Sequence, residues 1–234
     1  MFQSGLVSIT FRSLSPEEIV DLVRRAGLDA IEWGGDVHVP HGDLGRARDV
    51  KALTRDAGLA VCSYGSYYRA GVSENDGLAF ADVLDTACAL GAPRIRVWAG
   101  NRSPDKANEK ERKAVVEDAR RIAALSAEKN IRIAFEYHSH SLTETDASAR
   151  AFYRDVDHAN VESYWQPPNG LSREDRRDGL RALAPMVSVV HVFHWLFPDG
   201  KTDRRPLREG GNDWAGYLDI LKKKRMDYIE DKAN

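Results

Sequence analysis

The stretch Lys129-Asn-Ile-Arg-Ile-Ala-Phe-Glu-Tyr-His138 shows the unit from which the chain is built. Asn130 follows a long helix-like segment, and a strand-like run of apolar residues begins immediately after it. A glycine or asparagine in the left-handed conformation ends a helix and turns the chain directly into the next element. The strand-like run then ends in Glu136, Tyr137 and His138, which include groups that bind metals or transfer protons.

The junction recurs three more times, with glycine in place of asparagine. It is found at Ala26-Gly27, Ala57-Gly58 and Leu90-Gly91, each followed at once by a strand-like run. Helix starts are marked too, because Ser15-Pro-Glu-Glu18 forms a capping box with proline at the first helical position, and Ser103-Pro104 repeats the start signal. These signals fix the direction of each helix at both ends.

We predict eight strands alternating with seven helices. The strands lie near residues 5–11, 28–33, 59–65, 93–99, 131–138, 161–167, 187–195 and 226–231. The helices lie near residues 15–26, 43–57, 76–90, 104–129, 144–158, 172–184 and 213–225. Strict alternation requires parallel strands joined by right-handed crossovers, which is the α/β class.

Eight strands favour a closed (β/α)8 TIM barrel over a doubly wound open sheet. The open sheet in its nucleotide-binding form has a glycine-rich fingerprint after the first strand, and Thr10-Phe-Arg-Ser-Leu-Ser15 has none. The chain ends at Asn234, directly after the predicted eighth strand. We therefore expect a barrel without its final helix, left open there or covered by a partner subunit.

Composition limits the classes of partner. The 234 residues are 42% hydrophobic and contain no linker, which suits one domain spanning residues 1–234. The 34 basic and 36 acidic side chains give a net charge of -2, so we expect neither nucleic acid nor a membrane surface as a partner. Without a signal peptide or a run of ~20 apolar residues, the chain is expected to be soluble and cytoplasmic. Cys62 and Cys88 show no metal-ligand spacing and fit a reducing compartment.

Strand parity predicts the direction of the reactive groups. Side chains alternate along a strand, so Glu136 and His138 point to one face and Phe135 and Tyr137 to the other. The apolar set should face the helices, which places Glu136 in the barrel mouth at the strand's carboxyl end. A carboxylate there is costly to desolvate unless a cation shares the site. His191, near the end of the seventh strand, and Glu230, near the end of the eighth, could complete a metal-binding set of Glu, His and Glu.

Each of these residues has a simpler interpretation. For Glu136 it is an ion pair with one of three arginines, Arg94, Arg96 and Arg132. His191 could be a hydrogen-bonded core histidine, and Glu230 could be solvated near the chain end.

The pattern resembles the xylose isomerase-like superfamily of sugar isomerases and epimerases. In that superfamily a glutamate on strand five, an aspartate on strand six, a histidine on strand seven and a glutamate on strand eight bind a divalent metal. An arginine-containing loop, a glycine pair and an Asp-Trp follow the histidine. The chain shows the same order in His191, Arg204-Arg205, Gly210-Gly211 and Asp213-Trp214.

Strand six departs from this pattern. Gln166 stands in the aspartate's place, and Asn169 replaces a histidine three positions further on. The resemblance then implies Glu136, Gln166, His191 and Glu230 as ligands of Mn²⁺, Mg²⁺, Co²⁺ or Zn²⁺. A glutamine oxygen brings no charge, so we expect weaker metal affinity.

By this resemblance the chain is a metal-dependent isomerase or epimerase. The metal would chelate an open-chain ketose or a hydroxy-keto acid, while Glu136 and Glu230 take and return a proton through an enediolate. The residues that we expect to contact substrate are His138, Arg204, Arg205, Tyr67 and Trp98. The alternatives are an apurinic-site endonuclease-like metal hydrolase and a catalytically impaired sugar-binding barrel, and a homo-oligomer remains open.

Overall fold

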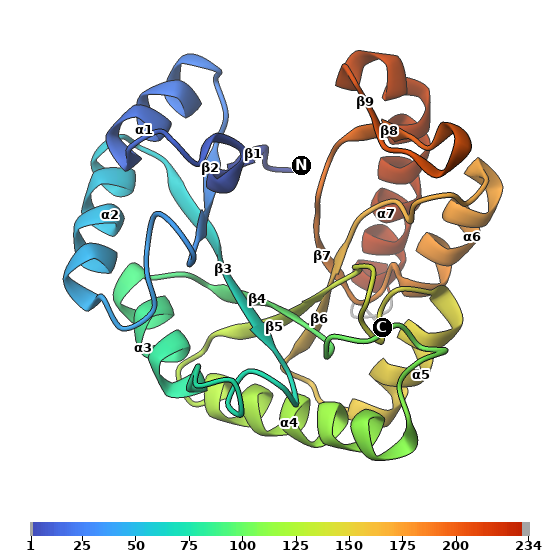
Figure 1. Cartoon of the computed structure of the whole chain (residues 1–234). Helices are drawn as coiled ribbons and strands as arrows, with labels where there is room; N and C mark the ends of the chain where they lie inside the picture. The colour runs from blue at the N-terminus through green and yellow to red at the C-terminus, as the bar shows by residue number, and fades with distance from the viewer. Residues whose placement is uncertain (1, 231–234) are drawn as a thin grey trace.

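The computed structural model describes the backbone of residues 2–230 and the side chains of residues 2–223. Seven parallel strands form one sheet in the order in which they occur along the chain. They are β1 (Gly5–Val7), β2 (Ala30–Gly34), β3 (Ala60–Arg69), β4 (Arg94–Trp98), β5 (Arg132–Glu136), β6 (Val161–Trp165) and β7 (Val187–Val190). Figure 1 shows the sheet as an arc with β1 and β7 at its two ends. The α/β TIM-barrel class is thus confirmed, in the form of a half-barrel.

Helices cover the outer side of the arc (Figure 1). They are α1 (Pro16–Arg25), α2 (Leu44–Asp56), α3 (Phe80–Leu90), α4 (Glu109–Ala127), α5 (Asp146–Val156), α6 (Arg173–Leu183) and α7 (Gly211–Glu230). The core lies between them and the sheet, where Phe135 of β5 packs edge-on against Phe152 of α5 with ring centroids 4.8 Å apart. The predicted outward direction of Phe135 is therefore confirmed. No helix in the described part of the chain is long and apolar enough to cross a membrane.

The local signals explain most element boundaries. The capping box at Ser15 is present, and Gly91 ends α3 in the left-handed conformation with φ of 72°. The expected start of α4 at residue 104 is wrong, because a stronger signal follows it. Asn108 and Glu111 form a reciprocal capping box, and the helix begins at Glu109.

The expected eighth strand at residues 226–231 is also wrong. Helix α7 continues through residue 230 without interruption. The reason is local: Met226 and Asp227 follow Arg225, so the glycine or asparagine stop that directly precedes β2, β3, β4 and β5 is missing here. Over residues 2–230, the barrel thus has its seventh helix but no strand between β1 and β7.

The expected strand at 187–195 divides in two. β7 ends at Val190, and His194–Leu196 forms β8, which pairs antiparallel with β9 (Asp203–Arg205). The connection between residues 197 and 212 is therefore partly a hairpin. Three short 3-10 helices complete the described elements, at Ser8–Phe11, Pro198–Gly200 and Leu207–Gly210.

Candidate functional site

Five side chains, four from strands and one from the residue after a fifth strand, meet inside the half-barrel toward the carboxyl ends of the strands. They are Glu32 of β2, Arg96 of β4, Glu136 of β5, Tyr164 of β6 and His191, which follows β7 directly. The two carboxylates and the guanidinium are almost fully buried, while the His191 side chain remains 15% exposed. The cluster is consequently open to solvent on the side of His191.

Arg96 joins the two carboxylates. Its Nε donates to Glu32 Oε1 at 2.7 Å, and its Nη1 donates to Glu136 Oε2. Gly65 on β3 makes room for this arrangement, because a Cβ at that position would lie 2.8 Å from Arg96 Nη2 and 2.9 Å from Glu32 Oε1. The glycine is thus required by the ion pair rather than by its own backbone conformation.

His191 lies between the same two carboxylates. Its Nε2 is 3.3 Å from Glu32 Oε2, and its Nδ1 is 3.3 Å from Glu136 Oε1. The Tyr164 hydroxyl donates to Glu32 Oε2, and the Tyr164 and His191 rings lie 4.6 Å apart between centroids. Each carboxylate therefore has one oxygen held by Arg96 and the other facing the histidine.

Mutual charge sets the ionisation of the cluster. Burial alone would raise the pKa of Glu136, but Arg96 and His191 outweigh it and lower that pKa to about 2. Arg96 and His191 likewise hold the pKa of Glu32 well below its usual range against burial. Burial would lower the pKa of His191, yet the two carboxylates raise it to about 9. Both glutamates are thus ionised at neutral pH.

The simpler interpretation of Glu136 is confirmed only in part. Its ion pair with Arg96 exists, but it uses Oε2 and leaves Oε1 facing His191. Arg94 and Arg132 instead pair with Glu162, near the amino-terminal ends of β4, β5 and β6. The convergence of Glu136 and His191 expected from their strand positions is confirmed.

Three of the predicted substrate residues form a shelf beside Glu136. Trp98 Nε1 donates to Glu136 Oε2 at 2.6 Å. The rings of Tyr67 and His138 lie 5.4 and 4.7 Å from that of Trp98, and the Arg69 guanidinium lies over the same ring at 5.1 Å. Tyr67 has φ of 58°, inside an irregularity of β3, and this strained backbone turns its ring toward Arg96.

The other predicted site residues have different surroundings. Gln166 Nε2 donates to the Tyr137 carbonyl at 2.7 Å. On β9, Arg204 lies over the Trp195 ring at 5.1 Å, and Arg205 pairs with Asp203 at 3.0 Å. Both arginines thus contact residues of the hairpin itself. Glu230 is on α7, and its side chain is outside the described residues.

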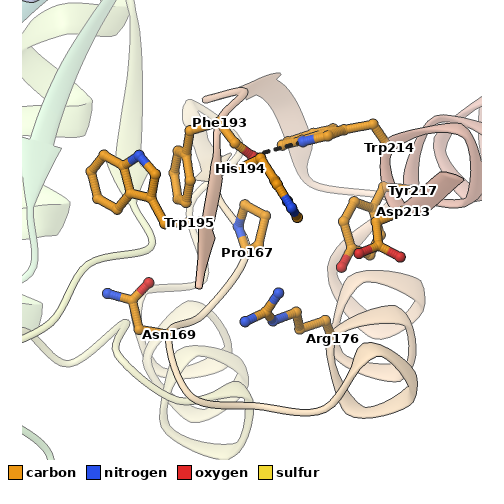
Figure 2. A pocket seen from close by; sticks show the side chains of 9 residues that line it. All are labelled: Pro167, Asn169, Arg176, Phe193, His194, Trp195, Asp213, Trp214 and Tyr217. Atoms are coloured by element: carbon orange, nitrogen blue, oxygen red, sulfur yellow. Dashed lines mark hydrogen bonds between the residues drawn. The ribbon is translucent and has the colours of Figure 1, made fainter. Parts of the chain in front are cut away.

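A small cavity lies where the hairpin meets the rest of the fold. Figure 2 shows it between the connection after β6, the start of β8 and the first turns of α7. The Trp214 indole donates to the Phe193 carbonyl at 2.8 Å, and the Phe193 and Trp195 rings are stacked 4.3 Å apart. A volume of about 10 Å³ admits roughly one water molecule. The cavity is therefore too small for a sugar. The contacts of Trp214 and Phe193 around it hold the hairpin in place.

Glu32, Arg96 and Tyr164 were not recognised from the sequence as site residues. Glu32 carried a usable signal, since it lies near the end of a predicted strand just as Glu136 does. Arg96 was considered only as one of three possible partners of Glu136. Tyr164 carried no signal of its own, because a tyrosine in a buried strand is ordinary core packing.

Two donors in the cluster fit a divalent ion. Donor atoms about 2.1 Å from one ion lie roughly 3.0–3.4 Å apart, and Glu136 Oε1 and His191 Nδ1 are 3.3 Å apart. The Gln166 amide nitrogen is already used, which leaves its oxygen available as a ligand. Among the side chains of residues 2–223, no three His, Cys, Asp or Glu residues are grouped to hold a metal. A complete set therefore needs a donor from outside that group, such as the Gln166 oxygen.

Comparison with known proteins agrees with the architecture. The model of a family described as xylose isomerase-like TIM barrel matches residues 20–229. The sequence has no significant match among proteins of curated function. A xylose isomerase-like TIM barrel protein from Mycobacterium smegmatis in complex with magnesium has a similar structure, with TM-score 0.74 and 16% identity over 96% of this chain and 87% of that one.

Two further solved structures are similar. A D-allulose 3-epimerase from Methylomonas sp. gives TM-score 0.71 and 18% identity over 96% of this chain and 81% of that one. The probable 3-DHS dehydratase AsbF from Bacillus anthracis gives TM-score 0.68 and 21% identity over 83% of this chain and 74% of that one. At these identities the likeness establishes the fold.

Proposed function

Because this chain belongs to the xylose isomerase-like TIM barrel family, we propose that it is an isomerase or epimerase. It would move a proton next to the carbonyl of a small sugar or hydroxy-keto acid. The observation that carries the proposal is the contact between Glu136 and His191 at the carboxyl ends of β5 and β7, where TIM-barrel enzymes place their chemistry.

Glu136 is the proton acceptor in this proposal. Arg96 and Trp98 hold its Oε2, so the carboxylate has one orientation, with Oε1 toward His191. Two donors keep this carboxylate ionised and hold it in one orientation, so it needs no reorganisation before it meets a substrate. Glu230 was expected at the end of an eighth strand and lies at the end of α7 instead, so we do not propose it as the partner that returns the proton.

The shelf of Tyr67, Trp98 and His138 suits the body of a sugar. Aromatic faces bury the apolar C–H face of a sugar ring or chain and leave its hydroxyls free. The shelf is joined to the base through the Trp98 indole, which contacts Glu136 directly. A substrate packed on the shelf would thus present carbon atoms to the carboxylate. Arg204 and Arg205 remain proposed contacts from the hairpin.

We also propose that the site is metal-dependent, with Glu136 Oε1, His191 Nδ1 and the Gln166 oxygen as donors. A divalent ion held there would supply Lewis-acid stabilisation of enediolate charge. The neutral Gln166 gives the set one negative charge fewer than an aspartate would. A hard cation such as Mg²⁺ or Mn²⁺ suits the oxygen-rich donors, and the expected affinity is modest.

Solvent deuterium exchange tests the proposal. The protein is incubated in D₂O with Mn²⁺ and a panel of ketoses, ketose phosphates and hydroxy-keto acids, and ¹H NMR follows the signal of the carbon next to the carbonyl. At least one compound should lose that signal in a protein-dependent way.

Metal analysis of protein purified without chelator should find about one ion per chain, lost on Glu136→Ala. If no compound exchanges with any divalent ion, the proposal is wrong, and nicking of abasic DNA would favour the hydrolase alternative.

A further inference from the structure

We propose that Glu32 is a positioning residue for His191. It accepts a hydrogen bond from Nε2–H, and this bond fixes the ring so that Nδ1 faces Glu136. The metal-binding consequence rests on the proposed function, whereas the hydrogen bond itself does not.

The chemistry of Glu32 determines the direction of this bond. Its Oε2 is 3.3 Å from His191 Nε2 and already accepts from the Tyr164 hydroxyl. Its Oε1 accepts from Arg96 Nε. An ionised carboxylate has no proton to donate, so the hydrogen at this contact belongs to Nε2 of the histidine. While His191 is protonated Nδ1 also carries a hydrogen, and a metal ion on the side of Glu136 would take Nδ1 by displacing that proton, with Nε2–H still bound to Glu32.

Glu32 is held firmly enough to act as an anchor. Its side chain is 1% exposed, and both of its oxygens are bound. Ser63 Oγ lies 3.4 Å from the Tyr164 hydroxyl and extends the network behind it. Gly65 allows the carboxylate and Arg96 to approach β3 closely. The orientation of the Glu32 carboxylate is therefore already fixed, and its hydrogen bond to His191 costs no further rotational entropy.

This geometry matches a known arrangement around metal-binding histidines. Such a histidine usually donates its second N–H to a carboxylate, a carbonyl or water, and loss of that partner typically costs 10–100-fold in metal affinity. His191 has the two required neighbours on opposite ring nitrogens, Glu32 at Nε2 and Glu136 at Nδ1, each at 3.3 Å. Glu32 thus acts on the ion through His191 rather than by contact.

Glu32→Gln tests the proposal, and Glu162→Gln is the matched control. The change keeps the size of the side chain and removes its charge. Glu162 also pairs with arginines inside the half-barrel, at 2.8 Å from Arg132 and 3.4 Å from Arg94, and has no recorded contact with His191. A role of Glu32 limited to ion pairing would make the two variants alike in every readout except stability.

The first readout needs neither metal nor turnover. The protein is treated with a chelator to remove metal ions, and its histidines are labelled with ¹⁵N. NMR should then show an Nε2–H of His191 that is protected from solvent, and the His191→Asn variant assigns this signal. We expect that signal in the wild type and in Glu162→Gln, and its loss in Glu32→Gln. A protected signal that persists in Glu32→Gln overturns the proposal, as does a wild type without one. If Glu32→Gln does not fold, Glu32→Asp withdraws the carboxylate by one methylene and should lose the signal as well.

The second readout is Mn²⁺ affinity by calorimetry. We expect Glu32→Gln to bind Mn²⁺ about 10–100-fold more weakly than the wild type, and Glu162→Gln to bind within about twofold of it. Equal affinity in wild type and Glu32→Gln overturns the positioning role. A wild type that binds no Mn²⁺ contradicts the proposed metal dependence, and the NMR signal then decides the Glu32 contact by itself.

Discussion

Two clusters of arginine and glutamate lie inside the same half-barrel, and they differ in a way that separates structure from function. Near the amino-terminal ends of the strands, Arg94 and Arg132 share one carboxylate, Glu162, and all three side chains are partly exposed. Toward the carboxyl ends, Arg96 is shared by Glu32 and Glu136 and is almost completely buried.

The excess of carboxylates at the carboxyl end is the instructive difference. One arginine cannot balance two buried glutamates, so that cluster needs a further cation, and His191 lies where it can supply one. The amino-terminal cluster has two arginines for one glutamate and requires nothing more. Barrel enzymes use the carboxyl end for chemistry and the other end for stability, and the positions of the two clusters agree with the site that we propose.

The largest effect that we predict is from Arg96→Leu. It leaves two carboxylates buried without their shared guanidinium and should cost about 3–5 kcal/mol of unfolding free energy. Arg132→Leu, in the amino-terminal cluster, removes a 40% exposed partner and should cost about 0–1 kcal/mol. Urea unfolding of the two variants measures both values. Equal losses would contradict the distinction between the clusters.

Trp98→Phe should show that the aromatic shelf acts on Glu136. The ring is kept, but the N–H bonded to Glu136 Oε2 at 2.6 Å is lost, and a hydrogen bond to a charged group contributes about 1.5–3 kcal/mol. Stability and deuterium exchange should both fall. Trp214→Phe is the control, because its indole bonds to the Phe193 carbonyl in the hairpin anchor. The Trp214→Phe variant should lose about 0.5–1.5 kcal/mol of unfolding free energy, and its deuterium exchange should be unchanged. A loss of exchange in this variant would show that the hairpin contributes to the chemistry.

Gly65→Ala should disturb the carboxyl-end cluster through packing alone. The added methyl would meet Arg96 Nη2 and Glu32 Oε1 at under 3 Å, and both of these side chains are almost completely buried. Overpacking of this kind costs about 1–3 kcal/mol. Gly45→Ala on α2 is the control, because the nearest atom to its Cβ would be Asp43 Oδ1 at 3.5 Å. Thermal unfolding should show no loss for Gly45→Ala, and a Gly65→Ala protein as stable as wild type would mean that the ion pair tolerates a shift.

The smallest effect concerns a buried histidine outside the cluster. His38 lies between Ser8 Oγ at 2.9 Å and the Leu14 carbonyl at 3.2 Å, and burial lowers its pKa. A lowered pKa in the folded state means that the unfolded chain takes up this proton first as pH falls below about 6.5. The stability difference between wild type and His38→Gln should therefore shrink between pH 7 and pH 5. A difference that grows on acidification would mean that His38 is protonated in the folded protein.

Much of this arrangement was predictable from local sequence signals. The helix-stop residues Gly27, Gly58, Gly91 and Asn130 predict where four strands begin. The alternation of side chains along β5 predicts that Glu136 points into the barrel. His191 followed from its position at a strand end. Each of these inferences uses only neighbouring residues, and such information is sufficient when the helix stop and the strand pattern agree.

What the sequence did not reveal depends on contacts between distant segments. Glu32 and His191 are 159 positions apart, and nothing near either residue indicates that they meet. Arg96 could not be chosen over Arg94 or Arg132, because the choice depends on how far along the barrel each arginine lies. The regular alternation of helices and strands earlier in the chain predicts a strand at residues 226–231. The helix instead continues through residue 230, because no stop residue directly precedes residue 226.

Deuterium exchange by a pair of variants tests the central claim most directly. Glu136→Gln and Glu162→Gln make the same chemical change at opposite ends of the half-barrel, and each is assayed in D₂O with Mn²⁺ and the substrate on which the wild type acts best. The account predicts that Glu136→Gln loses exchange by at least about 100-fold, while Glu162→Gln retains it within about threefold once both are shown to be folded. Undiminished exchange in Glu136→Gln, or equal loss in the two variants, would contradict it.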